Sequence, residues 1–160
     1  MLKHGFLLDT CVISELIKPS PSSNVVRWVD GQDEDGFYVS VITLGEIEKG
    51  ISKLPEGKKK ERLQAWLYSE LTDRFNDRIL DVSLDVAHTW GRILGEAEKH
   101  GRSLPVIDAL LAATAITKGL TVVTRNTDDM KESGAALLDP WEEESAEGGV
   151  ANGSGNQKEE

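Results

Sequence analysis

Short apolar runs alternate with amphipathic helical segments along most of this chain. Residues 5–9, GFLLD, form an apolar run that ends in an acid, and the apolar residues of segment 12–18 follow at helical spacing. The remaining expected strands are 37–42, 78–82, 120–124 and 135–139, and the remaining expected helices are 22–30, 43–54, 57–75, 84–100 and 105–118. Such repeated strand–helix units predict an α/β fold with a mostly parallel sheet flanked by helices.

The length and the charge of the chain divide it into a body and a tail. With 160 residues the chain is long enough for one domain, expected over residues 1–141. Residues 142–160 hold six Glu, one Lys and almost no aliphatic side chain, so this acidic tail is expected to be disordered. The tail carries half of the net charge of −10. The mildly acidic body that remains is unlike a protein that grips duplex nucleic acid with clustered Lys and Arg.

Cys11 is the single cysteine of the chain, so no internal disulfide is expected. The N-terminal segment MLKHGFLLDT lacks the long apolar stretch of a signal peptide, and no run approaches the roughly 18 apolar residues of a membrane helix. We therefore expect a soluble cytoplasmic protein that does not associate with a membrane.

Acidic residues fall where strands end or helices begin. Asp9 closes the first expected strand, Glu46 opens the helix after the second, Asp108 lies near the start of the most apolar helix, and Asp129 follows the strand at 120–124. The carboxyl ends of parallel strands meet at one edge of a sheet, so these acids are expected to converge there. Carboxylate oxygens suit Mg²⁺ or Mn²⁺, which would offset the mutual repulsion of the acids.

Each acid also has an explanation without a function. Glu46 with Thr43 forms a capping box, Asp108 in a first helical turn complements the helix dipole, and Asn126 is a suitable helix cap with Asp129 at its third position. Asp9 is harder to explain in this way, because an acid at the end of an apolar strand is costly to bury without a partner. Asp9 is therefore the anchor of the metal-site hypothesis.

Four runs of the sequence together resemble the PIN-domain ribonucleases, specifically the VapC and FitB-like toxins of bacterial toxin–antitoxin pairs. The runs are FLLDTCVISELIKP, SVITLGEIEKGI, LPVIDALLAATAITKGLTVVTRNTDDM and LLDPW. They occur in the family's order and span residues 6–141, which makes the resemblance specific although each run alone is weak. The resemblance implies a PIN-like three-layer sandwich whose mostly parallel sheet has four to five strands.

The resemblance also implies a catalytic site for hydrolysis of RNA phosphodiester bonds with Mg²⁺, or with Mn²⁺ as an alternative metal. Asp9, Glu46 and Asp108 match three of the family's metal-site acids, and the fourth position matches either Asn126 or Asp129. Asp9 and Asp108 would be direct ligands, and Glu46 a ligand through water or a base. Thr124 and Arg125 would contact phosphate or orient ligands. Cys11 departs from the family, in which Asn often follows the Asp-Thr pair.

The partners that the resemblance implies are an RNA substrate, a cognate antitoxin protein, DNA bound only through that antitoxin, and a second copy of the chain in a homodimer. Because of Cys11 and the open fourth position, an alternative is a catalytically weakened PIN-fold protein that acts through an antitoxin-like partner in a DNA-bound regulatory complex. The basic run from Lys58 to Arg62 either guides RNA or forms a solvated helix face. A dinucleotide-binding site is excluded, because no glycine motif follows the first strand.

Overall fold

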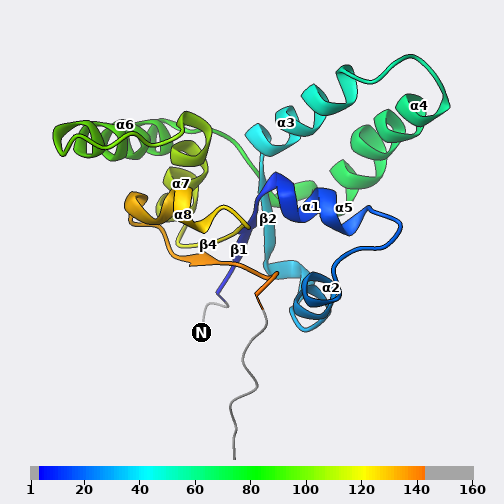
Figure 1. Cartoon of the computed structure of the whole chain (residues 1–160), viewed down its shortest axis with the longest axis horizontal. Coiled ribbons are helices and arrows are strands. Elements are labelled where there is room, and N and C mark those ends of the chain that lie inside the picture. Colours follow the sequence, from blue (N-terminus) through cyan, green and yellow to red (C-terminus); the bar gives the residue numbers. More distant parts are fainter. Residues whose placement is uncertain (1–3, 143–160) are drawn as a thin grey trace, which may run out of the picture.

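The computed structural model describes residues 4–142, and a five-stranded parallel sheet forms their centre (Figure 1). The strand order is β3-β2-β1-β4-β5, and every neighbouring pair is parallel. The strands are β1 (Phe6–Leu8), β2 (Phe37–Ser40), β3 (Ile79–Leu80), β4 (Thr121–Val123) and β5 (Leu137–Leu138). This confirms the predicted α/β class and the number of strands.

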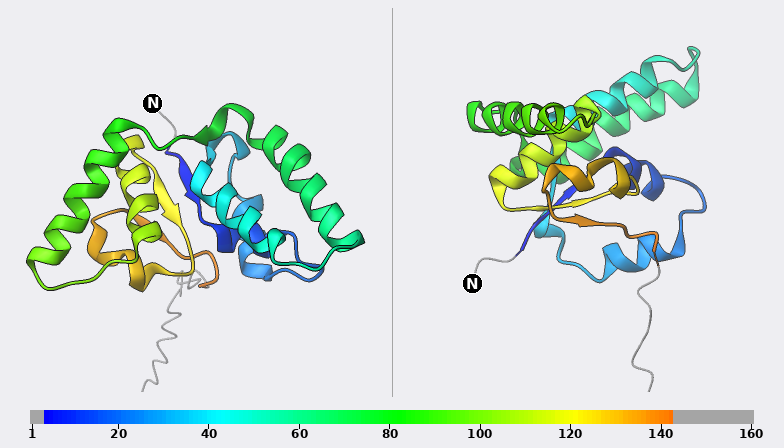
Figure 2. Two further views of the ribbon diagram at one scale, coloured as in Figure 1. Left: turned by 90° about the horizontal axis from the view of Figure 1, so that it is seen from above. Right: turned by 60° about the vertical axis from the view of Figure 1, so that its left-hand side comes forward.

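Helices cover both faces of the sheet and form two wings in Figure 2. One wing consists of α1 (Thr10–Leu16), α2 (Ser23–Asp30), α3 (Val41–Ser52), α4 (Lys58–Ala65) and α5 (Thr72–Phe75). The other consists of α6 (Leu84–Lys99), α7 (Val106–Lys118) and α8 (Thr127–Met130). Short 3-10 turns lie at Glu34–Gly36, Asn76–Arg78 and Lys131–Ser133. The three layers match the sandwich that the sequence predicts.

The central strand β1 separates two hydrophobic cores. Leu8 packs into the core of the α1–α5 wing together with Val39 and Phe75, whereas Leu7 packs into the core of the α7 and α8 wing together with Leu111. Successive side chains of a strand point to opposite faces of a sheet, so three apolar residues in β1 serve both cores. This central position also brings the end of β1 next to the ends of β2 and β4.

Two predicted boundaries were wrong in detail. The second strand ends at Ser40 rather than at residue 42, because the Ser40 hydroxyl accepts a hydrogen bond from the Ile42 backbone N–H at 3.1 Å and starts α3 at Val41. The last helix of the predicted set starts at Val106, with Pro105 as its N-cap rather than its first residue. The first shift places Glu46 two positions deeper in its helix, whereas the second places Asp108 one position closer to the start of its helix.

The predicted helix at residues 57–75 is continuous from Lys58 but contains a π-helical turn, Trp66–Leu71, between α4 and α5. The Thr72 hydroxyl donates to the Leu67 carbonyl at 2.8 Å, five residues earlier. The apolar residues of this segment recur every fourth position, and an α-helix would gradually rotate them away from one face. The wider π-turn keeps Leu67, Leu71 and Phe75 all buried against the sheet.

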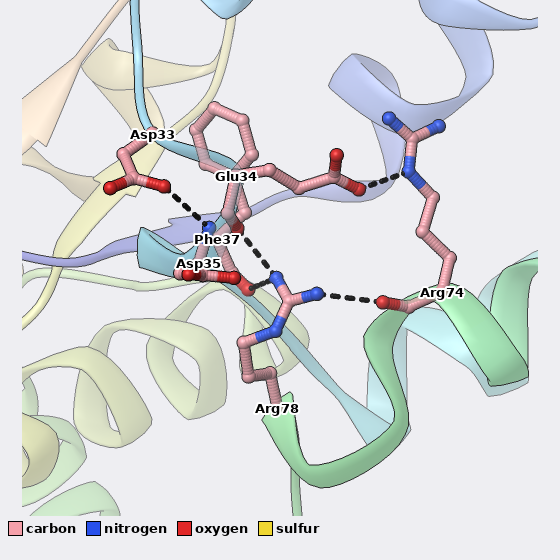
Figure 3. A network of polar contacts seen from close by, with 6 residues as sticks. All are labelled: Asp33, Glu34, Asp35, Phe37, Arg74 and Arg78. Carbon is pink, nitrogen blue, oxygen red and sulfur yellow. Dashed lines mark hydrogen bonds and ion pairs between the residues drawn. The ribbon is translucent and has the colours of Figure 1, made fainter.

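An arginine network joins the amino ends of β2 and β3 (Figure 3). Arg78, just before β3, donates to the Glu34 and Phe37 carbonyls at 2.6 and 2.7 Å and to the Arg74 carbonyl at 2.7 Å. The Arg74 guanidinium binds the Glu34 carboxylate at 2.5 Å, and this contact holds the pKa of Glu34 below its usual value. The network therefore fastens α5 and β3 to the strand that leads into α3.

Two further predictions concern the periphery of the molecule. The predicted disordered tail, residues 142–160, lies outside the described residues except for Glu142. Among residues 4–142, no helix has both the length and the apolar composition that a membrane crossing requires.

Candidate functional site

Asp9 lies directly after β1 and is buried, with 5% of its surface exposed. One of its carboxylate oxygens, Oδ1, accepts a hydrogen bond from the Thr10 backbone N–H at 2.7 Å, and Oδ2 accepts from the Thr124 hydroxyl at 2.8 Å. Thr124 directly follows β4, so the carboxylate joins the ends of the two central strands. These contacts fix the orientation of an acid that the sequence placed at this edge.

Glu46 lies in the second turn of α3 and faces α1. Its Oε1 accepts a hydrogen bond from the Thr10 hydroxyl at 3.1 Å. The predicted alternative, a capping box between Thr43 and Glu46, is wrong, because Ser40 is the N-cap of α3. Thr43 is fully buried inside the first turn, and its hydroxyl has no hydrogen-bond partner among the described residues. Glu46 is thus held by a residue of the neighbouring helix, next to Asp9.

Asp108 occupies the first turn of α7, as the sequence predicts. Burial raises its pKa from 3.8 to about 6, and the negative charges of Asp9, Asp129 and Glu46 add to the shift. An acid placed only to complement the helix dipole would gain stability as a charged group. Asp108 instead lies near acids from three other elements, and their negative charges disfavour its ionised form.

The two candidates for the fourth position, Asp129 and Asn126, make different contacts. Asp129 is one of the acids whose charge raises the pKa of Asp108, and it lies in α8. Asn126 is the N-cap of α8, but its side chain makes no capping hydrogen bond. Its backbone N–H donates instead to the Thr124 hydroxyl at 3.0 Å, and its carbonyl accepts from the Asp129 N–H at 3.2 Å. Asp129 thus adds negative charge near Asp108, and the choice of the fourth ligand stays a prediction.

Cys11 takes part in the hydrogen bonding of this edge. Its Sγ lies 3.7 Å from Asp9 Oδ2 and 3.7 Å from the Thr124 hydroxyl, and it accepts the Arg125 backbone N–H at 3.5 Å. Burial, supported by the nearby Asp9 charge, raises the pKa of the thiol. A protonated thiol is a poor nucleophile, so Cys11 serves as a hydrogen-bonding link between β1 and β4.

The Arg125 side chain contacts an aromatic ring. Its guanidinium lies over the ring of Trp141, 5.3 Å from the centroid. The Trp141 carbonyl in turn accepts a hydrogen bond from the Asn24 side chain at 2.9 Å, which ties the end of the described chain to α2. The predicted contact of Arg125 with phosphate stays a prediction.

The donor chemistry of the acid cluster suits a hard divalent cation. All four side chains offer carboxylate oxygens, and the negative charges of the other three add to the burial that raises the pKa of Asp108. Within residues 4–142, no three His, Cys, Asp or Glu side chains are already gathered closely enough to hold a metal ion. Asp9, Glu46, Asp108 and Asp129 would therefore have to draw together around an ion, whose charge would offset their repulsion.

Comparison with known proteins gives the family of this fold and site. The family model described as PIN domain matches residues 6–134, which include all four acids. The chain belongs to the PIN-domain family. The PIN domain thus accounts for nearly the whole described part of the chain.

Relatives of this PIN domain include toxins and ribonucleases. The chain is 38% identical over 135 residues to the toxin FitB of Neisseria gonorrhoeae, covering 84% of this chain and 97% of FitB. It is 34% identical over 136 residues to the VapC ribonuclease Y4jK of Sinorhizobium fredii, covering 85% and 97%. The solved structure of FitAB bound to an IR36 DNA fragment superposes with a TM-score of 0.82 at 35% identity, covering 88% of this chain and 99% of that one.

Thr10 is the residue of this site that sequence reasoning missed. It binds two acids at once, Asp9 through its backbone N–H and Glu46 through its hydroxyl. The available signal was its position, since a hydroxyl residue directly after a strand-end acid lies at the same sheet edge. Its link to Glu46 depends on how α1 and α3 pack, which local sequence does not reveal.

Proposed function

We propose that this chain is a Mg²⁺-dependent endoribonuclease that acts as the toxin of a toxin–antitoxin pair. The observation that carries this proposal is that the negative charges of Asp9, Glu46 and Asp129, which come from three other elements, add to the burial that raises the pKa of Asp108. Its relatives that bear the names ribonuclease and toxin support the same activity.

The cofactor follows from the donor set and the family. PIN-domain ribonucleases of the VapC type are generally dependent on a divalent metal. Asp9, Asp108, Glu46 and Asp129 would hold the ion, with Mg²⁺ the expected metal and Mn²⁺ a replacement of similar chemistry. When bound, the ion supplies positive charge to the scissile phosphate and lowers the pKa of a water molecule.

The residues of the chain position this chemistry. Thr10 and Thr124 hold the two oxygens of Asp9 in one orientation, and the Thr10 hydroxyl also holds Glu46. Glu46 is the group that would accept a proton from the attacking water. Asp108, with a pKa near 6, keeps a proton more readily than an ordinary Asp and would release it when the cluster is neutralised.

The proposed partners follow from the relatives whose structures are known. One solved relative is FitAB bound to DNA, and another is FitAcB of Neisseria gonorrhoeae at 38% identity. We propose that this chain likewise binds a cognate antitoxin, forms a homodimer, and meets DNA only through the antitoxin. The alternative of a weakened, regulatory copy loses part of its basis, because Cys11 does form hydrogen bonds with Asp9 and accepts one from Arg125.

The test is an RNA cleavage assay with the full chain, purified free of any partner. Structured and single-stranded RNAs are incubated with Mg²⁺, with Mn²⁺ or with a chelator, and Asp9→Asn is compared with Asp73→Asn. Asp73 is an exposed acid of α5 outside the cluster, so its replacement makes the same charge change. We expect metal-dependent cleavage that Asp9→Asn abolishes and Asp73→Asn retains. Cleavage at the wild-type rate by a folded Asp9→Asn protein would refute the nuclease assignment.

A further inference from the structure

A strongly basic segment stands out from this acidic chain. Residues 49–62 carry six Lys or Arg against two Glu, a net charge of +4 in a chain whose total is −10. The segment covers the end of α3 and most of α4, which lie side by side as a hairpin at the upper right of Figure 1. The basic residues, named here the basic hairpin, are Lys49, Lys53, Lys58, Lys59, Lys60 and Arg62.

Most charges of the basic hairpin are available to a ligand. Lys60 pairs with Glu56 at 2.6 Å, and its side chain is only 12% exposed. The other five side chains are exposed, and none of them forms an ion pair within 4.0 Å with another described residue. Glu56 and Glu61 are exposed on the same surface, so its charge is predominantly rather than wholly positive.

A groove connects the basic hairpin with the acid cluster. It has a volume of about 340 Å³ and lies between α1, α3 and α4. Thr10 and Glu46 line it at the acid cluster, and Lys59 lines it on α4. Between them its wall is apolar and includes Ile47, Ile51 and Leu63. A ligand that fills this groove would thus touch the basic hairpin and the cluster at once.

We propose that single-stranded RNA docks along this groove, with its phosphates on Lys58, Lys59 and Arg62 and its bases and sugars against the apolar wall. This inference rests on the proposed function and assigns the path by which the substrate reaches the acids. A positive rim that follows the backbone, combined with an apolar wall for the bases, is what unpaired nucleic acid needs. A duplex hides its base faces and would use only the charges.

The experiment measures binding without cleavage. Full-length Asp9→Asn protein is titrated, in Mg²⁺ buffer at several salt concentrations, into a fluorescently labelled single-stranded RNA whose anisotropy reports binding. Lys58→Glu/Lys59→Glu is compared with Lys99→Glu/Lys118→Glu, which makes the same charge change at exposed lysines of α6 and α7. Melting temperatures of all variants establish that each is folded.

We expect the hairpin variant to bind RNA at least about tenfold more weakly, and the control variant about as tightly as its parent. The slope of log affinity against log salt should fall by about 0.7 for each phosphate contact that is lost. Equal weakening in both variants, or unchanged binding in the hairpin variant, overturns the inference. Unchanged binding would indicate that the apolar groove accommodates a protein segment rather than RNA.

Cleavage assays separate this inference from the proposed function. In the otherwise wild-type chain, Lys58→Glu/Lys59→Glu should raise KM while kcat stays near its original value, because the acids are untouched. If the basic hairpin binds RNA but neither the wild-type chain nor any variant cleaves it, the proposed function is refuted and the docking path stands. If cleavage depends on metal but Lys58→Glu/Lys59→Glu has the KM of the wild-type chain, the docking path is refuted and the proposed function stands.

Discussion

At the scale of single residues, the acid cluster depends on short-range contacts made by residues that carry no charge. Thr10 binds Asp9 and Glu46, and Thr124 binds Asp9 while it accepts the Asn126 N–H. Such neighbours orient carboxylates before a metal arrives, and losing one typically costs 10- to 100-fold in metal affinity. The acids were predictable because strand ends of a parallel sheet converge, whereas these supporting contacts depend on packing.

Replacement of Thr10 tests this support. Thr10→Val keeps the shape of the side chain and the backbone N–H to Asp9 but removes the hydroxyl that holds Glu46. We expect Mn²⁺ affinity, measured by electron paramagnetic resonance titration, to fall about tenfold, and Thr10→Ser to restore it. Equal affinities of the Val and Ser variants would show that the hydroxyl does not position Glu46.

The fourth acid can be identified by its effect on Asp108. Asp129→Asn removes a negative charge that raises the pKa of Asp108, so that pKa should fall, and Mn²⁺ affinity should fall as well. Asn126→Ala should change neither, since its side chain makes no capping bond. Carboxyl NMR titration reads the pKa. A larger effect of Asn126→Ala on metal binding would move the fourth ligand to Asn126.

Asp108 should give the metal-free protein an unusual dependence on pH. Its folded pKa, about 6, lies above its ordinary value of 3.8, so the folded state binds the proton more tightly than the unfolded chain does. Its contribution to stability is therefore present below about pH 4 and lost as the pH rises through about 6. Asp108→Asn should stabilise the metal-free protein at pH 7.5, by on the order of 1 kcal/mol after solvent screening.

Thermal unfolding in chelator at pH 4 and pH 7.5 measures this effect, with Asp73→Asn as the exposed control. The gain in melting temperature from Asp108→Asn should appear at pH 7.5 and be small at pH 4. A gain of equal size at both pH values would mean that the negative charge of Asp108 is not its cause.

At the scale of elements, the positions of strands and helices were predictable, but the junctions between them were not. Val41 and Ile42 are β-branched and suit a strand, yet the Ser40 hydroxyl caps a helix that includes both. This junction rules out the capping box for Glu46, whose role in a metal site stays a prediction. Similarly, the π-turn at Trp66–Leu71 reflects contacts with the sheet rather than a local preference of its residues.

The arginine network at the amino ends of β2 and β3 should stabilise that edge. Arg78→Met leaves three carbonyl groups without their charged donor, those of Glu34, Phe37 and Arg74. We expect the free energy of unfolding, measured in urea, to fall by about 1–3 kcal/mol. Arg62→Met, at an exposed position of α4, should change it by less than about 0.5 kcal/mol. If both variants lose the same stability, the network adds nothing.

At the scale of the whole molecule, the two wings share one strand and should unfold together. Leu7 and Leu8 are adjacent in β1, are 0% and 2% exposed, and belong to different cores. Because β1 pairs with both β2 and β4, weakening either core loosens the sheet that supports the other.

Leu7→Ala and Leu8→Ala should each lower the free energy of unfolding by about 2–5 kcal/mol within a single transition. Leu84→Ala, at a side chain that is 71% exposed, should have little effect. Circular dichroism and tryptophan fluorescence in urea follow the transition. Separate transitions for the two probes in either β1 variant would show that the wings are independent units.

The acids of the cluster lie far apart along the chain, at positions 9, 46, 108 and 129. The strand order of the sheet also places β4, which is synthesised late, directly beside β1, which is synthesised first. A ribosome that has released only the first hundred residues therefore holds a chain with two of the four acids and an unfinished sheet. A site built from these four acids is therefore complete only after translation has passed α8.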